Sequence, residues 1–246
     1  MSDRCRYTGL VWVGSIMNSL VVFLPGNIAG KFGGELKWSY LLNVPYALFP
    51  VLFAHRLFSL PAPANKPQSS STVTSTIHFL LNLILFPALL AAIALCFFRM
   101  FAAIGSPALP AVFWVENVEP YLKDPTLYPL LQMIIFVVYY VPVFIFAACS
   151  LYSPPITNNH AQWLADWSAI AFGGALQAQF SYVGPALHNI PTYPEPSWKA
   201  VPEQGWDYFV AANALMVLVP FLLFVKYSLL DREVASVNVK KTKKYR

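Results

Sequence analysis

The sequence predicts an all-α membrane protein with six transmembrane helices. Of its 246 residues, 57% are apolar and 11% are charged, whereas about a quarter of the residues in a soluble domain carry charge. The long apolar runs are continuous rather than alternating, which favours helices over barrel strands. Six runs reach the length of about 20 residues that a membrane-spanning helix needs. They cover residues 10–28, 38–58, 77–104, 127–151, 163–187 and 208–230.

The charge distribution predicts which side of the membrane holds the ends of the chain. An even number of spans places both ends on one side. If the basic tail is cytoplasmic, eleven of the 16 Lys and Arg residues lie on that side and five on the other, as the positive-inside rule requires. The sequence therefore predicts two cytoplasmic termini, with the acidic loops 116–124 and 195–207 in the lumen. The net charge of +5 comes from this tail and not from a basic stripe, so we expect no nucleic-acid partner.

The second and sixth runs share a spaced pattern that predicts an internal repeat. Asparagine, proline and a basic residue recur at the same intervals, as Asn43, Pro50 and Arg56 and as Asn213, Pro220 and Lys226. The preceding runs match more loosely, with Gly14 and Asn18 against Gly173 and Gln177. If the repeat unit has four spans, the chain contains one complete unit, residues 77–230, preceded by the back half of another, residues 1–60. A Pro- and Ser-rich segment, 61–76, reads as a cytoplasmic linker between them, and 231–246 as a basic cytoplasmic tail.

The fifth run, 163–187, is too polar to face lipid. It carries Asp166, Gln177 and Gln179 among glycines and alanines, and a buried amide without a partner is costly in hydrocarbon. We therefore expect this helix to face other helices or a polar cavity. Prolines within the runs should kink the helices and favour a cavity between them, although prolines are also common in membrane helices. They are Pro45, Pro50, Pro87, Pro142, Pro185 and Pro220.

Several stretches of the sequence resemble the transmembrane 6 superfamily. They are GLVWVGSIMNSLVVFLPGNIAGKFGGE, NVEPYLKDPTLYPLLQM, YYVPVF, DWSAIAFGGALQAQFS and ALHNIPTY. Members of this family carry two copies of the four-helix EXPERA domain, which also occurs in emopamil-binding protein, a sterol isomerase, and in the sigma-two receptor. The likeness covers about residues 7–230. It implies that Met1 falls where the third helix of the first copy would begin, either in a shortened isoform or in a divergent short relative.

The resemblance further implies a membrane protein of the endoplasmic reticulum with an internal pocket for a lipid and a role in sterol, triglyceride or lipoprotein handling. Isomerase chemistry needs a proton donor and acceptor, and the family positions that would supply them differ here. Phe136 and Tyr140 stand where the sigma-two pattern has Glu and Gln, Arg99 stands where an acid is expected, and Tyr182 replaces a usual His. We expect no catalytic residue, no cofactor and no metal site, since the cysteines and histidines also lack ligand spacing.

Most candidate site residues have two interpretations. Asp124 is either a pocket acid or a turn residue before Pro125, and Asp166 is either a helix N-cap or a ligand contact. Gln177 and Gln179 either join helices or line the pocket, and His188 is either a capping residue or part of the family motif. The candidates for a lipid pocket are Asn18, Asn43, Asp124, Tyr140, Asp166, Gln177, Gln179, Tyr182, His188 and Asn213.

The last four residues form K-K-x-x, with Lys243 and Lys244. This pattern resembles the dilysine signal that coat proteins read when they return cargo to the endoplasmic reticulum, although a positive-inside flank would look similar. The sequence thus favours a multi-pass protein of the endoplasmic reticulum and the ER–Golgi intermediate compartment.

Taken together, these features favour a non-catalytic protein that binds a sterol or neutral lipid and regulates lipid homeostasis, including triglyceride and lipoprotein secretion, lipid droplet content and cholesterol handling. One alternative is a sterol double-bond isomerase with a relay of Asp124, Asp166 and His188. The other is a scaffold whose loops 105–123 and 189–205 hold secretory or lipoprotein cargo. The sequence also leaves open whether the protein binds lipoproteins or lipid enzymes and whether it forms a homodimer.

Overall fold

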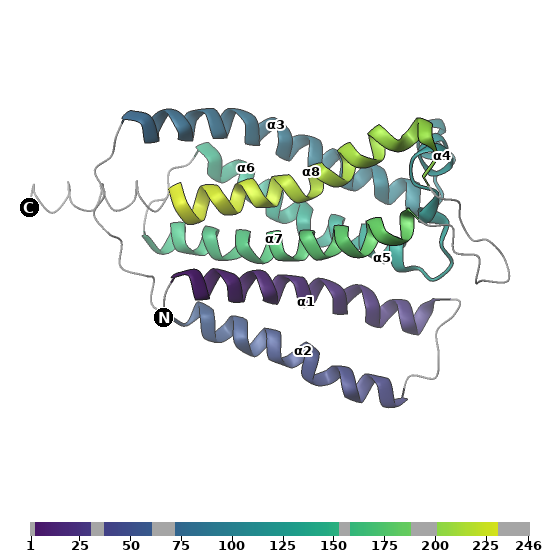
Figure 1. Ribbon diagram of the computed structural model, residues 1–246, viewed down its shortest axis with the longest axis horizontal. Coiled ribbons are helices and arrows are strands. Elements are labelled where there is room, and N and C mark those ends of the chain that lie inside the picture. The colour runs from purple at the N-terminus through teal and green to yellow at the C-terminus, as the bar shows by residue number, and fades with distance from the viewer. Residues whose placement is uncertain (1–2, 31–36, 61–71, 153–157, 188–200, 231–246) are drawn as a thin grey trace, which may run out of the picture.

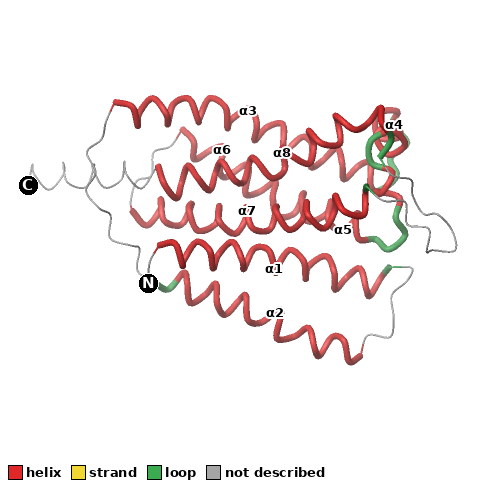
Figure 2. The backbone as a smooth tube through the Cα atoms, in the orientation of Figure 1, coloured by secondary structure: helices red, strands yellow, loops and turns green. Residues whose placement is uncertain are grey.

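The protein is an all-α membrane protein. The computed structural model covers residues 1–246 and describes 3–30, 37–60, 72–152, 158–187 and 201–230. Long helices run side by side along one axis, and the described residues form no strand (Figures 1 and 2). The start of the first helix and the end of the last lie at the same end of the bundle (Figure 1).

Each of the six expected runs is helical. The elements are α1 (Asp3–Ala29), α2 (Lys37–Phe58), α3 (Thr72–Ala103), α4 (Leu109–Asn117), η1 (Pro120–Lys123), α5 (Tyr128–Ile135), η2 (Phe136–Tyr140), α6 (Val141–Tyr152), α7 (Asn158–Ala186), η3 (Glu203–Gly205), α8 (Trp206–Val225) and η4 (Lys226–Leu230). The fourth run is one continuous rod of α5, η2 and α6. The segment between the third and fourth runs holds α4 and η1, two short helices at one end of the bundle (Figure 1).

Three helices begin at least five residues earlier than hydropathy indicates, and the first of them, α1, begins at Asp3. Helix α3 begins at Thr72, so the expected linker loses its last five residues, and α7 begins at Asn158. The apolar run marks only the part of a helix that faces hydrocarbon, while polar residues can continue the helix beyond it. The N-cap interpretation of Asp166 is therefore wrong, because this residue lies in the third turn of α7.

Five of the six rods are long and apolar enough to cross a membrane, and α7 is the exception among the described helices. It packs between α1 on one side and α8 on the other (Figure 1). The polar side chains Asp166 and Gln179 are buried against these neighbours, whereas another face of α7, with Leu176 and Phe180, is exposed. The expectation that this helix faces other helices is thus confirmed for its buried polar face, but its exposed apolar face was not expected.

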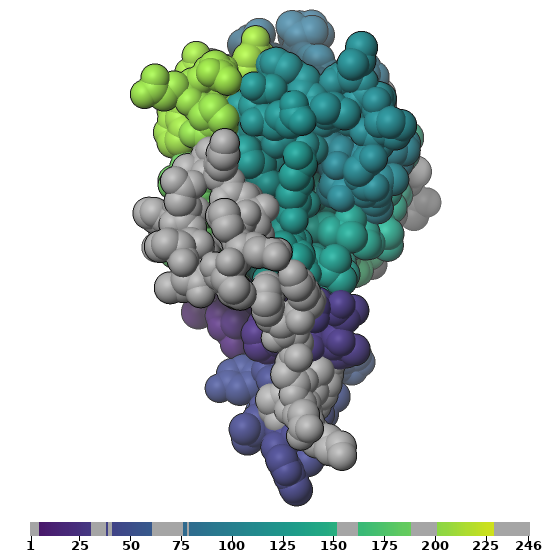
Figure 3. All heavy atoms as spheres, turned by 90° about the vertical axis from the view of Figure 1, so that its right-hand side faces the viewer, coloured from purple at the N-terminus to yellow at the C-terminus, as the bar shows by residue number. Residues whose placement is uncertain are grey.

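Helices α1 and α2 form a pair that projects from the rest of the molecule. Seen from the end that carries α4, the two helices extend beyond one side of the α3–α8 bundle (Figure 3). Helix α1 makes most of the contact, chiefly with α7, whereas α2 packs mainly on α1. Much of the surface of α2 is consequently exposed and apolar, including Leu42, Phe49 and Leu52, as expected of a helix in contact with lipid tails.

Helices α1 and α7 cross with their backbones in close contact at two glycines. A Cβ atom on Gly14 would collide with the carbonyl oxygen of Ile170, and one on Gly173 with the carbonyl oxygen of Val11. The contact is reciprocal, because each glycine meets the carbonyl three residues before the other glycine. Small residues at a helix crossing allow this approach in membranes, where packing rather than hydrophobic burial drives association.

Candidate functional site

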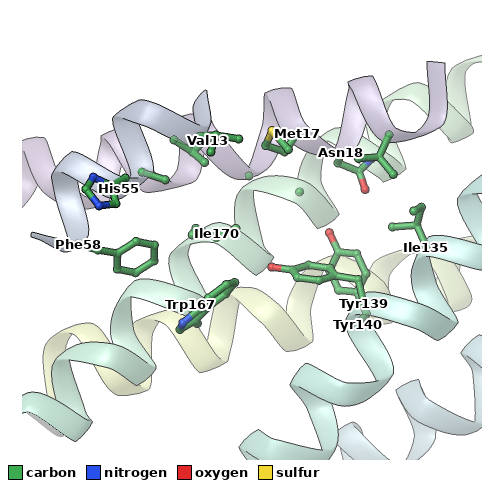
Figure 4. A pocket seen from close by; sticks show the side chains of 15 residues that line it. Val13, Met17, Asn18, His55, Phe58, Ile135, Tyr139, Tyr140, Trp167 and Ile170 are labelled. Atoms are coloured by element: carbon green, nitrogen blue, oxygen red, sulfur yellow. The ribbon is translucent and has the colours of Figure 1, made fainter. Parts of the chain in front are cut away.

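A cavity of about 570 Å³ lies where the α1–α2 pair meets the bundle. Its walls come from α1, α2, α7 and the α5–η2 segment (Figure 4). The volume falls within the range of roughly 300–1,000 Å³ that is usual for small-molecule sites. The cavity is partly open to the surroundings.

Most of the cavity wall is apolar. At the end of α2, Phe58 and Trp167 close one end with their ring centres 5.7 Å apart, and His55 lies beside them (Figure 4). Along α1 the wall runs from Val13 to Val21, roughly 12 Å at 1.5 Å per residue. Among the described residues that line the cavity there is no Lys, Arg, Asp or Glu. The site is therefore suited to an uncharged, largely apolar molecule.

Three polar side chains, Asn18, Tyr139 and Tyr140, border the other end of the cavity, with their oxygens just behind its apolar surface. Tyr140 is fully buried and Asn18 is 7% exposed. Both tyrosine hydroxyls and Asn18 Oδ1 are buried without a hydrogen-bond partner among the described residues, although such groups are usually paired. All three point into the same end of the cavity (Figure 4). This polar cluster lies at mid-span, because Asn18 is near the centre of Cys5–Ala29 and the tyrosines near the centre of Tyr128–Leu151.

A wide turn and a glycine position the tyrosines. Residues Phe136–Tyr140 form a π-helical turn directly before Val141 and Pro142. Proline cannot donate the usual helical hydrogen bond and clashes with the carbonyl four residues earlier, and wide turns of this kind are frequent at functional sites. On α7, a Cβ atom at Gly174 would stand 2.6 Å from the Tyr140 hydroxyl. Glycine at this position therefore leaves room for the hydroxyl.

A second polar cluster lies inside the α3–α8 bundle and is built around an ion pair. The side chains of Arg99 and Glu119 are both fully buried; Arg99 Nε and Nη2 donate to the carboxylate at 2.9 and 2.7 Å. Asn213 Oδ1 accepts a further bond from Arg99 at 3.3 Å, and Trp114 Nε1 donates to Glu119 at 2.8 Å. The guanidinium also lies over the Tyr182 ring, 4.9 Å from its centre.

The structure divides the predicted pocket residues between these clusters. Asn18 and Tyr140 line the cavity, whereas Tyr182 and Asn213 belong to the Arg99 cluster. Gln179 is buried nearby on α7 with both amide atoms unpaired among the described residues. Gln177 accepts a bond from Ser15 and donates to Ser181, which agrees with its interpretation as a link between helices. Asn43 lies on α2 outside the cavity wall, and His188, Lys243 and Lys244 lie outside the described residues.

The two candidate acids have structural partners at opposite ends of the molecule. Asp124 accepts bonds from the backbone N–H and the hydroxyl of Thr126, at 3.0 and 2.7 Å, as in a turn. Asp166 is bound by Arg6 Nε and Nη2 at 3.0 and 2.5 Å and by Gln162.

The distance between the two acids can be measured along α1. Arg6, the partner of Asp166, is near the start of α1. Thr126, the partner of Asp124, lies against Gly30 just after the end of α1. The length of α1 between them is roughly 36 Å. Asp124 and Asp166 therefore cannot act on one ligand atom, so a relay that uses both is wrong.

Several residues of these sites escaped sequence reasoning. Tyr139, His55 and Trp167 were missed because nothing in the sequence shows that α2 and α7 face one another across α1. Arg99 was noted only because it stands where an acid is expected, and Glu119 only as part of the acidic loop 116–124. An arginine inside a long apolar run is a sign of a buried partner, and Glu116 and Glu119 were the first acids after it in the sequence. Within the described ranges, no three His, Cys, Asp or Glu side chains lie close enough together to hold a metal ion.

Comparison with known proteins gives a consistent set of relatives. Residues 1–68 match the family described as Transmembrane 6 superfamily member 2-like, transmembrane domain. The chain is 36% identical over 228 residues to Transmembrane 6 superfamily member 2 of Rattus norvegicus, 33% over 224 residues to that of Homo sapiens, and 34% over 229 residues to that of Mus musculus. These alignments cover 89–91% of this chain but 57–58% of each relative, so the chain spans little more than half their length. No solved structure matches the chain.

Proposed function

Because this chain belongs to the transmembrane 6 superfamily, we propose that it is a non-catalytic membrane protein that binds a sterol or neutral lipid in the cavity between α1, α2 and α7. The observation that carries the proposal is the cavity itself, which is lipid-sized, almost wholly apolar and lined by no charged side chain among the described residues. A phospholipid head group would need a cationic or strongly polar partner, which this wall does not offer. A neutral lipid needs only apolar contact and one or two hydrogen bonds.

The arrangement of the acids supports a binding role over a catalytic one. Proton transfer to a sterol double bond requires an acid and a base within reach of the same ligand. The buried carboxylates Glu119 and Asp166 are each held by an arginine, and Asp124 is held in its turn. Each is thus engaged in holding the fold.

We also propose that the protein resides in the endoplasmic reticulum and the ER–Golgi intermediate compartment with both termini cytoplasmic, and regulates lipid homeostasis there. The support is the C-terminal pattern with Lys243 and Lys244, together with the family relationship. Lipid binding in the cavity would allow the protein to influence triglyceride or lipoprotein secretion, lipid droplet content or cholesterol handling.

We further propose that α1–α2 is a half repeat of the α7–α8 kind, attached to a complete EXPERA domain formed by α3 to α8. The reciprocal crossing supports this, since Gly14 meets Ile170 as Gly173 meets Val11. Two related helices that pack about an approximate two-fold axis would make such matched contacts.

Native mass spectrometry of the protein extracted from membranes tests the function. We expect a co-purified sterol or glyceride. Ala54→Phe, which places a large side chain on the cavity wall, should reduce it. Leu52→Phe is the matched control, because Leu52 lies on the same helix but is 61% exposed. Protein that carries no sterol or glyceride, or equal lipid content in both variants, would contradict the proposal.

A further inference from the structure

The polar end of the cavity has an unbalanced set of hydrogen-bonding groups. Asn18 Nδ2 donates to Gln132 Oε1 at 3.2 Å, which leaves Asn18 Oδ1 as an acceptor with no partner among the described residues. The hydroxyls of Tyr139 and Tyr140 are likewise unpaired. Their rings contact edge to face with centres 4.9 Å apart. The cluster therefore holds two phenol donors and one carbonyl acceptor just behind the cavity surface, and Gln132 Nε2 beside them is a further donor without a partner among the described residues.

This set distinguishes between classes of neutral lipid. An ester or ether oxygen can only accept, so it could pair with a tyrosine hydroxyl but would leave Asn18 Oδ1 unpaired. A free hydroxyl can donate to Asn18 Oδ1 and accept from Tyr139 or Tyr140 at once. Buried groups left without a partner discriminate strongly against a ligand that lacks the matching atom.

We propose that the cavity recognises a lipid with a free hydroxyl group, such as a sterol or a diacylglycerol, and holds that hydroxyl between Asn18, Tyr139 and Tyr140. This inference rests on the proposed lipid-binding function and specifies its ligand. The cluster is near mid-span, roughly 22 Å from the start of α1 and roughly 16 Å from its end. The hydroxyl therefore lies at the middle of the membrane, not at its surface as in a free lipid. The apolar body extends toward Phe58 and Trp167, where the wall is aromatic.

An alternative arrangement would place the hydroxyl at the other end of the cavity. His55 lies there and is exposed, and it could bind a hydroxyl at the membrane surface. The two arrangements place the hydroxyl against different residues of the cavity wall. Variants at the two ends of the cavity therefore distinguish them. We favour the mid-span cluster because its groups are buried and unpaired, whereas His55 can be satisfied by water.

Competition binding tests the inference. The full chain is reconstituted in lipid nanodiscs and saturable binding of tritiated cholesterol is measured, with cholesterol, cholesteryl methyl ether, dioleoylglycerol and trioleoylglycerol as competitors. We expect the methyl ether to compete about tenfold less well than cholesterol, because it cannot donate to Asn18. Dioleoylglycerol should compete and trioleoylglycerol should not if the site reads the hydroxyl alone. If dioleoylglycerol also fails, the hydroxyl lipid is a sterol.

Variants locate the hydroxyl. Tyr139→Phe and Tyr140→Phe should each weaken cholesterol binding by about three- to tenfold, the value of one hydrogen bond, and Asn18→Leu should abolish the difference between cholesterol and its ether. The phenylalanine variants keep the ring, so they should fold as well as the unaltered protein. Tyr208→Phe, on the exposed surface of α8, is the control. His55→Leu, at the other end of the cavity, should keep the preference for cholesterol over its methyl ether.

The outcomes separate this inference from the function on which it rests. If no competitor displaces cholesterol and binding is not saturable, the lipid-binding function itself fails. If cholesterol binds but its ether competes equally, or the tyrosine variants bind normally, the cavity holds lipid without forming specific hydrogen bonds to its hydroxyl group. If only His55→Leu weakens binding, the hydroxyl lies at the membrane surface. Either of the last two results overturns the inference alone.

Discussion

The two buried polar clusters of this protein use their groups in opposite ways. Inside the α3–α8 bundle, Arg99 and Glu119 bind one another, and Asn213 and Trp114 add further bonds. One guanidinium nitrogen, Nη1, keeps no partner. At the junction with α1 and α2, Asn18, Tyr139 and Tyr140 turn three polar atoms toward a cavity and pair none of them within the described chain.

The difference indicates which cluster supports the fold and which is available to a ligand. A buried ion pair in hydrocarbon must be satisfied inside the protein, because breaking it leaves an uncompensated charge. Neutral hydroxyls and amides are cheaper to leave unpaired. The bundle interior therefore pairs its opposite charges, although the Tyr182 hydroxyl and the Gln179 amide have no partner in the described chain. The junction pairs none of its three oxygens and also borders a cavity.

The largest expected effect comes from breaking the ion pair. Glu119→Gln removes the charge that compensates Arg99 and should destabilise the protein by about 3–5 kcal/mol, measured as unfolding in mixed detergent micelles. Glu116→Gln, at an exposed position on α4, should change little. The double variant Arg99→Met, Glu119→Met should recover most of the loss. A stable Glu119→Gln protein would show that the bundle does not depend on this pair.

The glycine crossing should show the next largest effect. Gly173→Ala places a methyl group against the carbonyl of Val11, so α1 and α7 must separate, at a cost of about 1–3 kcal/mol. Separation would also distort the cavity and reduce lipid retention. Gly184→Ala on the same helix meets nothing within 4 Å. It should be neutral or slightly stabilising, and equal behaviour of the two variants would refute the packing argument.

A smaller effect is expected at the ion pair that joins α1 to α7 near their starts. Asp166→Asn removes the charge opposite Arg6 and leaves the arginine one amide oxygen and the carbonyl of Leu60 as acceptors. The arginine is close to the start of α1 and can extend toward water, so the loss should be about 1–2 kcal/mol, less than for Glu119→Gln. Asp207→Asn, exposed on α8, serves as the control in the same unfolding assay. A loss as large as that of Glu119→Gln would show that both pairs are equally enclosed.

The smallest effect on stability is expected within the cavity. Without added lipid, Tyr140→Phe removes a hydroxyl that makes no bond to the described chain. Its unfolding free energy should therefore stay within about 0.5 kcal/mol of the unaltered protein, or rise slightly. A loss of more than about 1 kcal/mol would show that the hydroxyl is part of the core. The contrast between the two clusters would then disappear.

The sequence by itself determined the secondary structure of the spans. Continuous apolar runs of the length needed to cross a bilayer identified all six rods. The amides and small residues of 163–187 identified α7 as a helix that packs against other helices along its polar face. The motifs indicated the family. These features are local in sequence, so a single stretch is enough to carry each of them.

Only the tertiary structure decided which polar groups meet. Arg99 and Glu119 are 20 residues apart, and Arg6 and Asp166 are 160 apart. Hydropathy marks such residues as costly but does not name their partners. The cavity likewise depends on α2 and α7 facing each other beside α1, and on a π-helical turn that directs Tyr139 and Tyr140 to one end. Packing between distant segments fixes these contacts, since side-chain direction depends on how the rods are rotated against one another.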